Sequence, residues 1–229
     1  RKRRKPLHLV SVIIPAYKQE KTIKRDIKRV LVVLNQLRYK YEVIVVVDGQ
    51  VDKTYSRVKE IKHKKLKVFA YKTNLGKGHA IRYGMIRAKG DIIGFIDAGM
   101  DLNPNGLSML LEHFEWYNAD IIVGSKLHPV SKVNYPLYRK VLSIGYRTFV
   151  RLMFGLKIRD TQVGMKFFKK EVVKAVVPRL LVKQYAFDIE MLAVSHSLGF
   201  KRIFEAPIEL IFNDNSSINS KGFWNVILL

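Results

Sequence analysis

The sequence predicts an α/β fold with a mainly parallel β-sheet flanked by helices. Short runs rich in β-branched residues alternate with helical patterns along the first half of the chain, an order typical of a parallel sheet with crossover helices. The run Val43–Val47 is apolar at every position, as expected for a strand covered on both faces. With 229 residues, of which 48% are hydrophobic, the chain can bury the core of one large domain.

The first half contains five candidate strands separated by helical patterns. The strands are expected at Leu9–Ile14, Glu42–Val47, Leu66–Tyr71, Ile92–Ile96 and Ile121–Val123. The helices are expected near Glu20–Leu37, Lys53–Lys62, His79–Ala88 and Asn105–Trp116. In such sheets ligands bind beyond the carboxyl ends of the strands, so the polar residues that follow strands are the candidate site residues.

The last third of the chain predicts amphipathic helices. Residues Pro136–Gly155 read as one helix, in which Lys140, Arg147 and Arg151 form a basic stripe on a largely apolar cylinder. This pattern fits a helix in a membrane interface, and it equally fits a core helix with a solvated basic side. A further helix is expected at Phe187–Leu198 and a strand at Arg202–Leu210.

The charge balance predicts an anionic partner. The chain has 42 Lys and Arg against 19 Asp and Glu, a net charge of +23. Such an excess favours nucleic acid, anionic lipid or a phosphorylated substrate, and a general bias toward lysine is the alternative. No recognised RNA- or DNA-binding motif is present, so no nucleic-acid partner is expected. The absence of cysteine excludes disulfides and thiolate metal sites and favours a cytosol-facing location.

Neither end of the sequence reads as a signal peptide or a spanning helix. No apolar run reaches the roughly 18–20 residues that cross a bilayer, and the basic start R-K-R-R-K-P lacks an apolar h-region. The apolar residues 221–229 are expected to begin a membrane-associated segment.

Polar residues follow the first two predicted strands. Asp48, in V-V-V-D-G-Q-V-D-K-T, can accept hydrogen bonds from a ribose or from a base N–H, and Gly49 allows a sharp turn. Pro15 and Tyr17, in P-A-Y-K-Q-E, can form a pocket wall with the tyrosine ring stacked on a base. An ordinary strand–turn–helix entry, with Asp52 as a helix cap, is the alternative.

A glycine-rich loop leads into the third helix, N-L-G-K-G-H-A-I-R-Y-G at 74–84. Its backbone N–H groups and Lys77 can face a phosphate, and a plain turn before a helix is the alternative. The loop does not match G-x-x-x-x-G-K-[ST], which excludes a P-loop. No G-x-G-x-x-G follows the first strand, which counts against a dinucleotide fold.

The segment D-A-G-M-D at 97–101 ends the fourth strand with two carboxylates. Oxygen ligands at a strand end suit Mg²⁺ or Mn²⁺, and such ions commonly share their coordination with substrate phosphates. Asp97 and Asp101 are therefore candidate metal ligands, with an ordinary turn as the alternative.

Together these motifs resemble the family 2 glycosyltransferases, which have the GT-A fold. The matching segments are P-A-Y-x-x-E, V-V-x-D-G-x-x-D-x-T, N-x-G-K-G-x-A-I-R-x-G, D-A-G-M-D and G-S-K. In the second half, I-R-D-T-Q-V-G-M-K-F-F and Y-A-F-D-I-E-M-L resemble the polyprenyl-phosphate branch, which includes the dolichyl-phosphate glucosyltransferases and mannose synthases. The resemblance runs from about Leu9 to Leu210.

The resemblance implies a nucleotide-sugar donor, a divalent Mg²⁺ or Mn²⁺ and a polyprenyl monophosphate acceptor. It implies nucleotide contacts at Pro15, Tyr17, Gln19, Val47 and Asp48, with Asp97 and Ala98 beside the ribose and diphosphate. It places Lys126 of G-S-K near the phosphates, Arg139 near the acceptor phosphate, and Asp160 and Gln162 close to the reacting sugar.

Some positions depart from the family pattern. Val47 stands where two Asp often precede the glycine, and Gln19 stands where a first Glu is common. Gly99 occupies the third position of D-x-D and removes a usual metal ligand, which leaves Asp101 at the fifth position to bind the cation. A degenerate, non-catalytic member is therefore the alternative to an active enzyme.

The sequence predicts one catalytic domain over residues 1–229, with a nucleotide-sugar and metal-binding half at 9–125 and an acceptor-facing half at 126–220. The expected reaction is the metal-dependent transfer of a hexose to a polyprenyl phosphate, with inversion, at the cytoplasmic face of a membrane. UDP-glucose is the favoured donor and GDP-mannose the next. A sugar-nucleotide pyrophosphorylase is disfavoured because P-A-Y-K-Q-E stands where that class has a glycine-rich loop.

Overall fold

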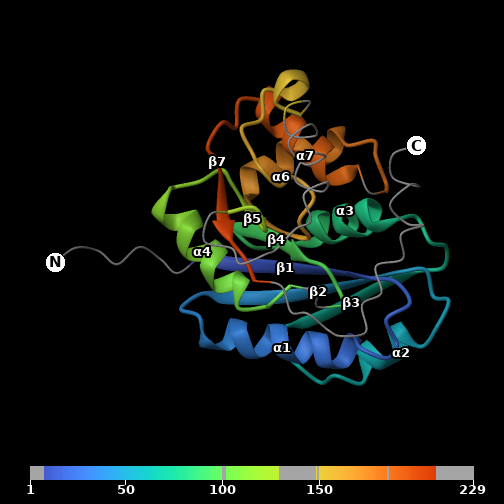
Figure 1. Cartoon of the computed structure of the whole chain (residues 1–229). Helices are drawn as coiled ribbons and strands as arrows, with labels where there is room; N and C mark the ends of the chain where they lie inside the picture. Colours follow the sequence, from blue (N-terminus) through green and yellow to red (C-terminus); the bar gives the residue numbers. More distant parts are fainter. Residues whose placement is uncertain (1–7, 100–101, 129–147, 149, 185, 210–229) are drawn as a thin grey trace.

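The computed structural model describes residues 8–99, 102–128, 148, 150–184 and 186–209. These residues form one seven-stranded sheet in the order β3-β2-β1-β4-β6-β5-β7, with helices on both faces (Figure 1). β1 pairs in parallel with β2 and β4, β2 with β3, and β5 with β7. The predicted α/β fold with a mainly parallel sheet is confirmed.

The strands lie close to their predicted positions, with one addition. They are β1 (Leu9–Ala16), β2 (Lys40–Asp48), β3 (Leu66–Tyr71), β4 (Ile92–Ile96), β5 (Ile121–Ser125), β6 (Met165–Lys169) and β7 (Ile203–Pro207). β6 was not predicted, and it runs antiparallel between β4 and β5. Its sequence M-K-F-F-K neither alternates nor is apolar throughout, because Lys166 is buried inside the strand.

The structure has the helices α1 (Ile23–Gln36), α2 (Thr54–Lys59), α3 (Lys77–Arg87), α4 (Gly106–Trp116), α6 (Lys170–Val176), a 3₁₀ turn (Val177–Arg179) and α7 (Phe187–Ser197). The helices α1 to α4 and α7 lie within a few residues of their predicted positions, whereas α6 and the 3₁₀ turn were not predicted. The Asp52 carboxylate accepts a hydrogen bond of 2.9 Å from the amide of Thr54, which begins α2. Asp52 therefore satisfies one free amide at the start of α2, although the N-cap residue itself is Lys53.

The predicted helix Pro136–Gly155 lies largely outside the described residues, including Lys140 and Arg147. Thr148 and residues 150–154 are helical, and Gly155 follows with a φ of 67°. Among the helices of the described residues, none is long and apolar enough to cross a bilayer.

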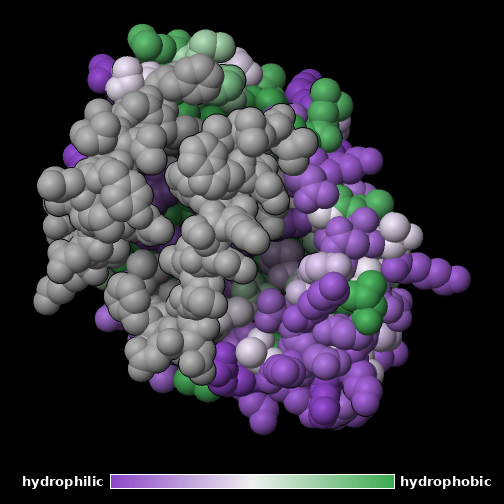
Figure 2. Space-filling model, turned by 45° about the vertical axis from the view of Figure 1, so that its right-hand side comes forward, coloured by the Kyte–Doolittle hydropathy of each residue, from purple (hydrophilic) through white to green (hydrophobic). Residues whose placement is uncertain are grey.

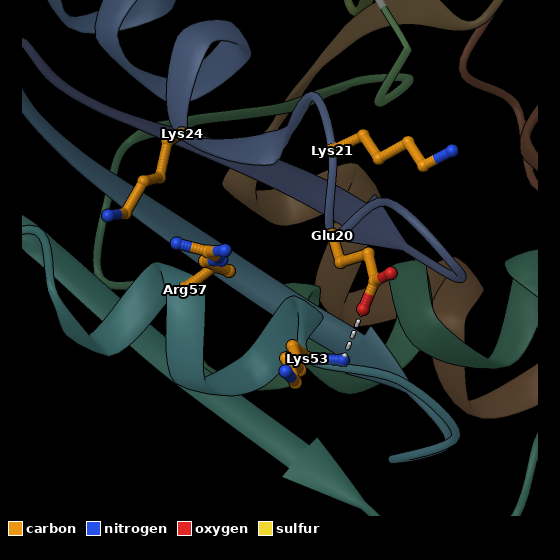
Figure 3. Close-up of a pocket in the computed structure, with 5 residues that line it drawn as sticks. All are labelled: Glu20, Lys21, Lys24, Lys53 and Arg57. Atoms are coloured by element: carbon orange, nitrogen blue, oxygen red, sulfur yellow. Dashed lines mark hydrogen bonds between the residues drawn. The ribbon is translucent and has the colours of Figure 1, made fainter.

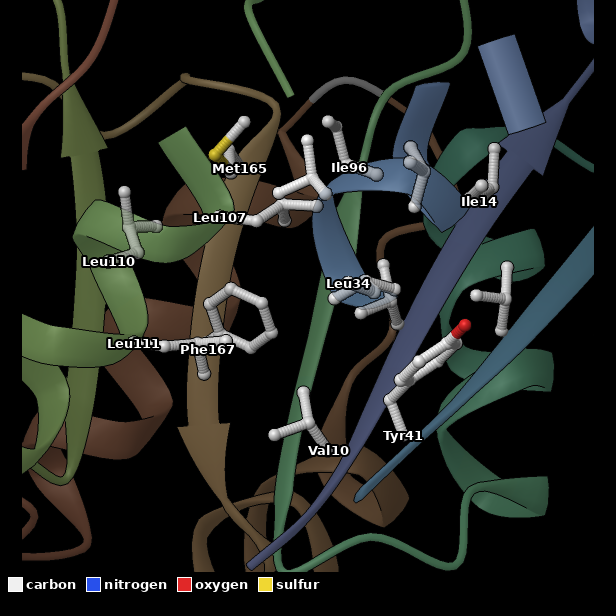
Figure 4. Close-up of a cluster of buried hydrophobic side chains, with 14 of the residues drawn as sticks. Val10, Ile14, Leu34, Tyr41, Ile96, Leu107, Leu110, Leu111, Met165 and Phe167 are labelled. Carbon is white, nitrogen blue, oxygen red and sulfur yellow. The ribbon is translucent and has the colours of Figure 1, made fainter. Parts of the chain in front are cut away.

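Two apolar cores cover the two faces of the sheet. Successive residues of β1 point to opposite faces: Val12 and Ile14 join the core under α1 and α4, whereas Ile13 joins the core under α3, α6 and α7. Figure 4 shows the first core, where Leu34 of α1 and Leu110 of α4 lie against the sheet. Each fully buried aliphatic side chain of this kind contributes about 1.5–3 kcal/mol to folding.

The strand order has a switch point between β1 and β4. From β1 the chain passes to β2 and β3 on one side and returns to β4 on the other. Ligands bind at such a switch point in open α/β sheets. The segments P-A-Y, V-D-G and D-A-G end β1, β2 and β4, so the fold brings the predicted donor-side motifs to one edge.

Candidate active site

Asp97 follows β4 at this edge and is held from two sides. Its amide donates to the carbonyl of Gly164 at 2.9 Å, and its Oδ2 accepts a hydrogen bond from Lys77 Nζ at 2.8 Å. Its Oδ1 is buried and has no hydrogen-bond partner among the described residues. Burial raises the pKa of Asp97, and the Lys77 ammonium opposes that rise. An unpaired buried acceptor is costly, so a bound hydroxyl, proton or cation would stabilise it.

Gly164 allows this arrangement because it has no side chain. A Cβ at this position would lie 1.9 Å from Asp97 Oδ2. The glycine of D-T-Q-V-G therefore gives the Asp97 carboxylate room to lie against the backbone that precedes β6.

Four buried or half-buried charged side chains form a series of ion pairs that begins at Asp97 and reaches α7 and β6. We call this series the buried ion chain; in order, it consists of Asp97, Lys77, Asp188 and Lys166. Lys77 Nζ lies 3.6 Å from Asp188 Oδ2, and Lys166 Nζ lies 2.5 Å from Asp188 Oδ1. Burial alone would lower the pKa of Lys77, but the carboxylates of Asp97 and Asp188 raise it above its usual value. Burial lowers the pKa of Lys166. Cations and anions alternate along the buried ion chain, so each charge is compensated by a neighbouring charge of opposite sign.

The structure brings Lys126, expected near the phosphates, together with Asp160 and Gln162, expected near the reacting sugar. The amide of Lys126 donates to Asp160 Oδ2 at 3.2 Å, and the amide of Gln162 also hydrogen-bonds to this carboxylate. Burial raises the pKa of Asp160, and the Lys126 charge opposes that rise. Glu205 on β7 holds the same segment, because its Oε1 accepts from the amide of Asp160 at 3.1 Å. Asp160 also interacts electrostatically with Lys166, which places it beside the buried ion chain.

Asp48 anchors the glycine-rich loop. Its Oδ1 accepts from the amide of Leu75 at 2.7 Å and its Oδ2 from the amide of Gly76 at 3.0 Å. The amide of Gly78 donates to the carbonyl of Lys183 at 2.8 Å. The sequence suggested that backbone N–H groups of this loop could face a phosphate, but these three donate to acceptors of the protein. The loop instead positions Lys77, whose Nζ donates to Asp97.

Asp26 supports the candidate site from α1, and sequence reasoning missed it. It lies on the apolar side of α1 and is fully buried, and its Oδ2 accepts from the amide of Gly99 at 3.2 Å. Gly99 has a φ of 96°, so Asp26 holds the D-A-G turn in a left-handed conformation from beneath. The available signal was an aspartate between Ile23 and Ile27, inside the apolar stripe of α1.

Comparison with known protein families decides the class of this protein. The model of the glycosyl transferase family 2 matches residues 11–177, the greater part of the chain. The chain belongs to glycosyl transferase family 2. It is therefore an enzyme of the glycosyltransferase class, and the match includes Lys77, Asp97, Asp160 and Lys166. Asp188 lies beyond the matched segment.

Relatives of this glycosyltransferase share most of its length. It is 30% identical to a dolichyl-phosphate beta-glucosyltransferase of Trichomonas vaginalis, over 95% of this chain and 70% of the relative. It is 33% identical to the dolichyl-phosphate beta-glucosyltransferase of Drosophila melanogaster, over 82% of this chain and 63% of the relative. This chain thus spans about two thirds of the length of these relatives.

A solved structure supports the fold of the glycosyltransferase. The glucosyl-3-phosphoglycerate synthase of Mycobacterium tuberculosis, solved with Mn²⁺, uridine diphosphate and phosphoglyceric acid, superposes with a TM-score of 0.67. The two proteins are 20% identical over 94% of this chain and 74% of the synthase. The likeness confirms the GT-A architecture expected from the sequence.

The other donor-side residues implied by the family resemblance end β1, β2 and β4. Pro15 and Val47 are buried, whereas Tyr17 is 40% exposed and Ala98 is half-buried. The amide of Gln19 donates to Thr54 Oγ1 at 2.8 Å. Val47 belongs to the core under α1, so its backbone rather than its side chain is available to a ligand.

Part of the predicted metal and acceptor set lies outside the described residues, namely Asp101 and Arg139. Among the residues that the structure does describe, no group of three or more His, Cys, Asp or Glu side chains is placed to hold a metal ion. Asp97 fits one position of such a site, because its unpaired Oδ1 is a carboxylate oxygen of the kind that Mg²⁺ and Mn²⁺ bind.

A hollow of about 430 Å³ lies on the described surface and is lined by Glu20, Lys21, Lys24, Lys53 and Arg57 (Figure 3). Glu20 accepts from the amide of Lys53 at 3.0 Å, and Lys24 pairs with Glu60. Glu20 is the glutamate of P-A-Y-x-x-E, but none of the residues expected to contact donor, metal or acceptor lines this hollow, so the candidate active site is the Asp97 edge.

Proposed function

We propose that this glycosyltransferase moves a hexose from a nucleotide sugar to a polyprenyl phosphate, with UDP-glucose as the favoured donor and GDP-mannose as the next. The similarity to two dolichyl-phosphate beta-glucosyltransferases supports this choice of substrates. One observation of the structure carries the proposal: the amide of Asp97, on the donor side, donates at 2.9 Å to the carbonyl of Gly164, in the D-T-Q-V-G segment that begins with Asp160 on the acceptor side. The two halves of the predicted site therefore contact each other at this point.

The acceptor phosphate needs no general base in this proposal. A phosphate monoester has a second pKa near 6 and is largely a dianion at pH 7, so it is already a nucleophile. The enzyme must instead gather two anions and stabilise the departing nucleoside diphosphate by positioning and charge. Lys126, next to Asp160, supplies a cation on the acceptor side, and Arg139 is expected to add a second one. The reaction is a direct displacement that inverts the anomeric carbon.

Donor binding is assigned to the carboxyl ends of β1, β2 and β4. Tyr17, which is 40% exposed, is the residue whose ring can stack on the base. Pro15, Gln19, Val47 and Asp48 shape the adjoining wall, and Ala98 and Asp97 lie beside the ribose and diphosphate. The unpaired Oδ1 of Asp97 supports this role, since it can accept from a ribose hydroxyl or bind a cation.

A divalent cation, Mg²⁺ or Mn²⁺, is part of the proposal. Asp97 and Asp101 would hold it, and when bound it neutralises charge on the diphosphate leaving group. Gly99 offers no side-chain ligand, so the donor phosphates should complete more of the coordination shell. We therefore expect weak binding of the cation alone and tighter binding in the presence of nucleotide.

The acceptor implies work at a membrane surface, on its cytoplasmic face. Leu152, Met153 and Phe154 are exposed next to the exposed Arg151, in the helical segment 150–154. In Figure 2 the coloured surface on the lower right is mostly hydrophilic, and hydrophobic side chains lie at the top, the end of the molecule where this segment lies in Figure 1. Basic residues near anionic headgroups contribute about 1 kcal/mol each. Binding to anionic liposomes that persists unchanged at high salt would contradict this electrostatic part.

A donor screen tests the proposed function. The protein is incubated with a short polyprenyl phosphate, Mg²⁺ or Mn²⁺, and either UDP-glucose or GDP-mannose. Release of nucleoside diphosphate and the mass of the lipid product are measured together, with reactions lacking lipid or metal as controls. We expect UDP release that depends on lipid and metal and matches the glycosylated lipid formed. Release without lipid product, or no release with either donor, would overturn the proposal.

A further inference from the structure

We propose that Asp188 is a positioning residue for the donor site, and that it acts on Asp97 through Lys77 with Lys166 as its counter-charge. This inference rests on the proposed function, because it concerns the same nucleotide site. The inference assigns a role to two buried charges, Lys166 on β6 and Asp188 on α7. Neither residue needs to contact the donor or the acceptor.

The burial of Asp188 and Lys166 is the first observation. Lys166 is fully buried within β6, and Asp188 in the first turn of α7 is 3% exposed. Lys166 Nζ donates to Asp188 Oδ1 and, at 2.6 Å, to the carbonyl of Val163. Hydrophobic residues of similar volume would fill such sites with equal or greater stability in many proteins, so a buried ion pair calls for an explanation beyond stability.

The second observation is the packing that positions Lys77 between the carboxylates of Asp97 and Asp188. Lys77 begins α3, and the start of α3 packs directly on the start of α7. A Cβ on Gly78 would lie 2.6 Å from Phe187 Cβ, and the Gly78 amide donates to the carbonyl of Lys183. The glycines of G-K-G therefore bring the two helix starts close enough for Lys77 to reach both Asp97 and Asp188.

The third observation is that Asp188 restricts a flexible cation. A lysine ammonium is a point charge on a four-carbon stem with several rotamers, and one partner does not fix its direction. With Asp97 Oδ2 at 2.8 Å and Asp188 Oδ2 at 3.6 Å, Lys77 Nζ is held between them. Lys77 therefore occupies Oδ2 of Asp97, while Oδ1 remains without a partner among the described residues. Asp188 thereby sets which oxygen of Asp97 is available to the donor.

Charge balance makes a single substitution insufficient as a test. Asp188→Asn removes one anion and leaves the buried Lys166 ammonium with only neutral acceptors, the amide oxygen and the Val163 carbonyl, so stability falls whatever else happens. The double variant Asp188→Asn/Lys166→Met removes one charge of each sign and replaces the lysine with an apolar chain. The double variant should recover stability, but its neutral amide cannot restore the second anionic partner of Lys77.

The experiment compares wild type, Asp188→Asn, the double variant and Glu42→Gln. Glu42 is a matched control, since it is a buried carboxylate paired with a lysine, Lys67 at 2.6 Å, on another part of the sheet. Thermal stability is measured for each protein, with the Kd for UDP and for GDP in the presence of Mn²⁺. Values of kcat and KM for the preferred donor and for the lipid acceptor are then determined.

We expect both Asp188 variants to bind the preferred nucleotide about tenfold more weakly, equivalent to about 1.4 kcal/mol. The double variant should nevertheless regain most of the stability lost by the single variant. The donor KM should rise while the acceptor KM stays unchanged, and Glu42→Gln should keep wild-type nucleotide affinity despite lower stability. Rescue of affinity together with stability in the double variant would show a merely structural pair and overturn the inference.

The failure of the inference is distinguishable from that of the proposed function. Wild-type protein that binds neither nucleotide would overturn both. Wild-type protein that binds UDP or GDP but glycosylates no polyprenyl phosphate would overturn the function alone, because the affinities of the variants still decide the role of Asp188.

Discussion

Two acidic side chains at opposite ends of the sheet are held in contrasting ways. Glu42, near the amino end of β2, accepts from Ser11 Oγ and the Lys89 amide at 2.7 Å each and from Lys67 Nζ at 2.6 Å. Asp97, at the carboxyl end of β4, accepts from Lys77 and keeps one buried oxygen unpaired among the described residues. Both carboxylates face a lysine, but only the first is fully satisfied by the fold.

The pKa directions follow the same contrast. Burial by itself would raise the pKa of Glu42, but hydrogen bonds from Lys67, the Lys89 amide and Ser11 lower it below its usual range. Burial raises the pKa of Asp97 because the protein provides fewer partners for its charge. A satisfied carboxylate stabilises the native state, whereas an unsatisfied one at a crevice is suited to bind a ligand. The following predictions test this difference.

The largest effect is expected for Asp97→Asn. Because the amide keeps the shape but loses the charge beside the donor phosphates and cation, kcat/KM should fall on the order of 10²–10³-fold. Steady-state nucleotide release measures the loss, and circular dichroism checks the fold. Retention of wild-type activity would show that Asp97 is not a donor-site residue.

Gly164→Ala should be nearly as harmful, although Gly164 has no side chain to contact a substrate. The new Cβ would lie 1.9 Å from Asp97 Oδ2, so the carboxylate must move. A misplacement of about 1 Å in a catalytic site can cost about 10²-fold in rate. The control is Gly106→Ala, whose Cβ meets the flexible Met165 side chain at 3.0 Å. Equal activities for the two variants would contradict the proposed constraint on Asp97.

Asp26→Ala should weaken donor binding to a smaller extent. Loss of the hydrogen bond between Asp26 and the Gly99 amide frees the D-A-G turn, and a bond of this strength corresponds to about a tenfold change in affinity. Asp26→Asn is the matched control, because its amide oxygen can still accept from Gly99. The Kd for UDP with Mn²⁺ is measured by calorimetry. Unchanged affinity in the alanine variant would refute the role of Asp26.

Glu42→Gln should leave the activity of the folded enzyme unchanged and reduce its stability by about 1–3 kcal/mol near neutral pH. Folding lowers the pKa of Glu42, so its ionised form contributes stability above the unfolded pKa of about 4.3, and this contribution is lost as the pH falls through the folded pKa. Denaturant unfolding at several pH values should therefore show the gap between wild type and variant closing in acid. A gap that does not depend on pH would contradict the assigned charge of Glu42.

The sequence predicted the regular part of the fold because its signals are local. Apolar runs and glycine-rich turns marked β1 to β5 and the helices α1 to α4. β6 escaped because its place depends on non-local pairing: M-K-F-F-K is inserted antiparallel between strands that lie far away in the chain. Its buried Lys166 breaks the apolar pattern, and only the distant Asp188 makes that burial tolerable.

The sequence predicted those residues of the candidate site that lie in motifs at the ends of strands. Asp97 and Asp48 were found from their positions at the ends of β4 and β2, but the hydrogen-bond partners of their carboxylates could not be predicted from the sequence. Asp48 holds two amides of the glycine-rich loop, and Lys77 bonds to Asp97 although the sequence suggested that it faces a phosphate directly. The sequence marks Asp188 only as part of the A-F-D-I-E motif. Its pairing with Lys166 could not be predicted, because a buried ion pair depends on the proximity of residues in the folded structure.

The most direct test of the account measures product formation by three proteins side by side. Wild type, Asp97→Asn and Glu42→Gln are each given UDP-glucose, Mn²⁺ and a short polyprenyl phosphate, and the glucosylated lipid is quantified by mass spectrometry at a temperature where all three are folded. We predict equal product from wild type and Glu42→Gln, and product reduced on the order of 10²-fold or more for Asp97→Asn. Equal product from the two variants, or no glucosylated lipid from the wild type, would contradict the account.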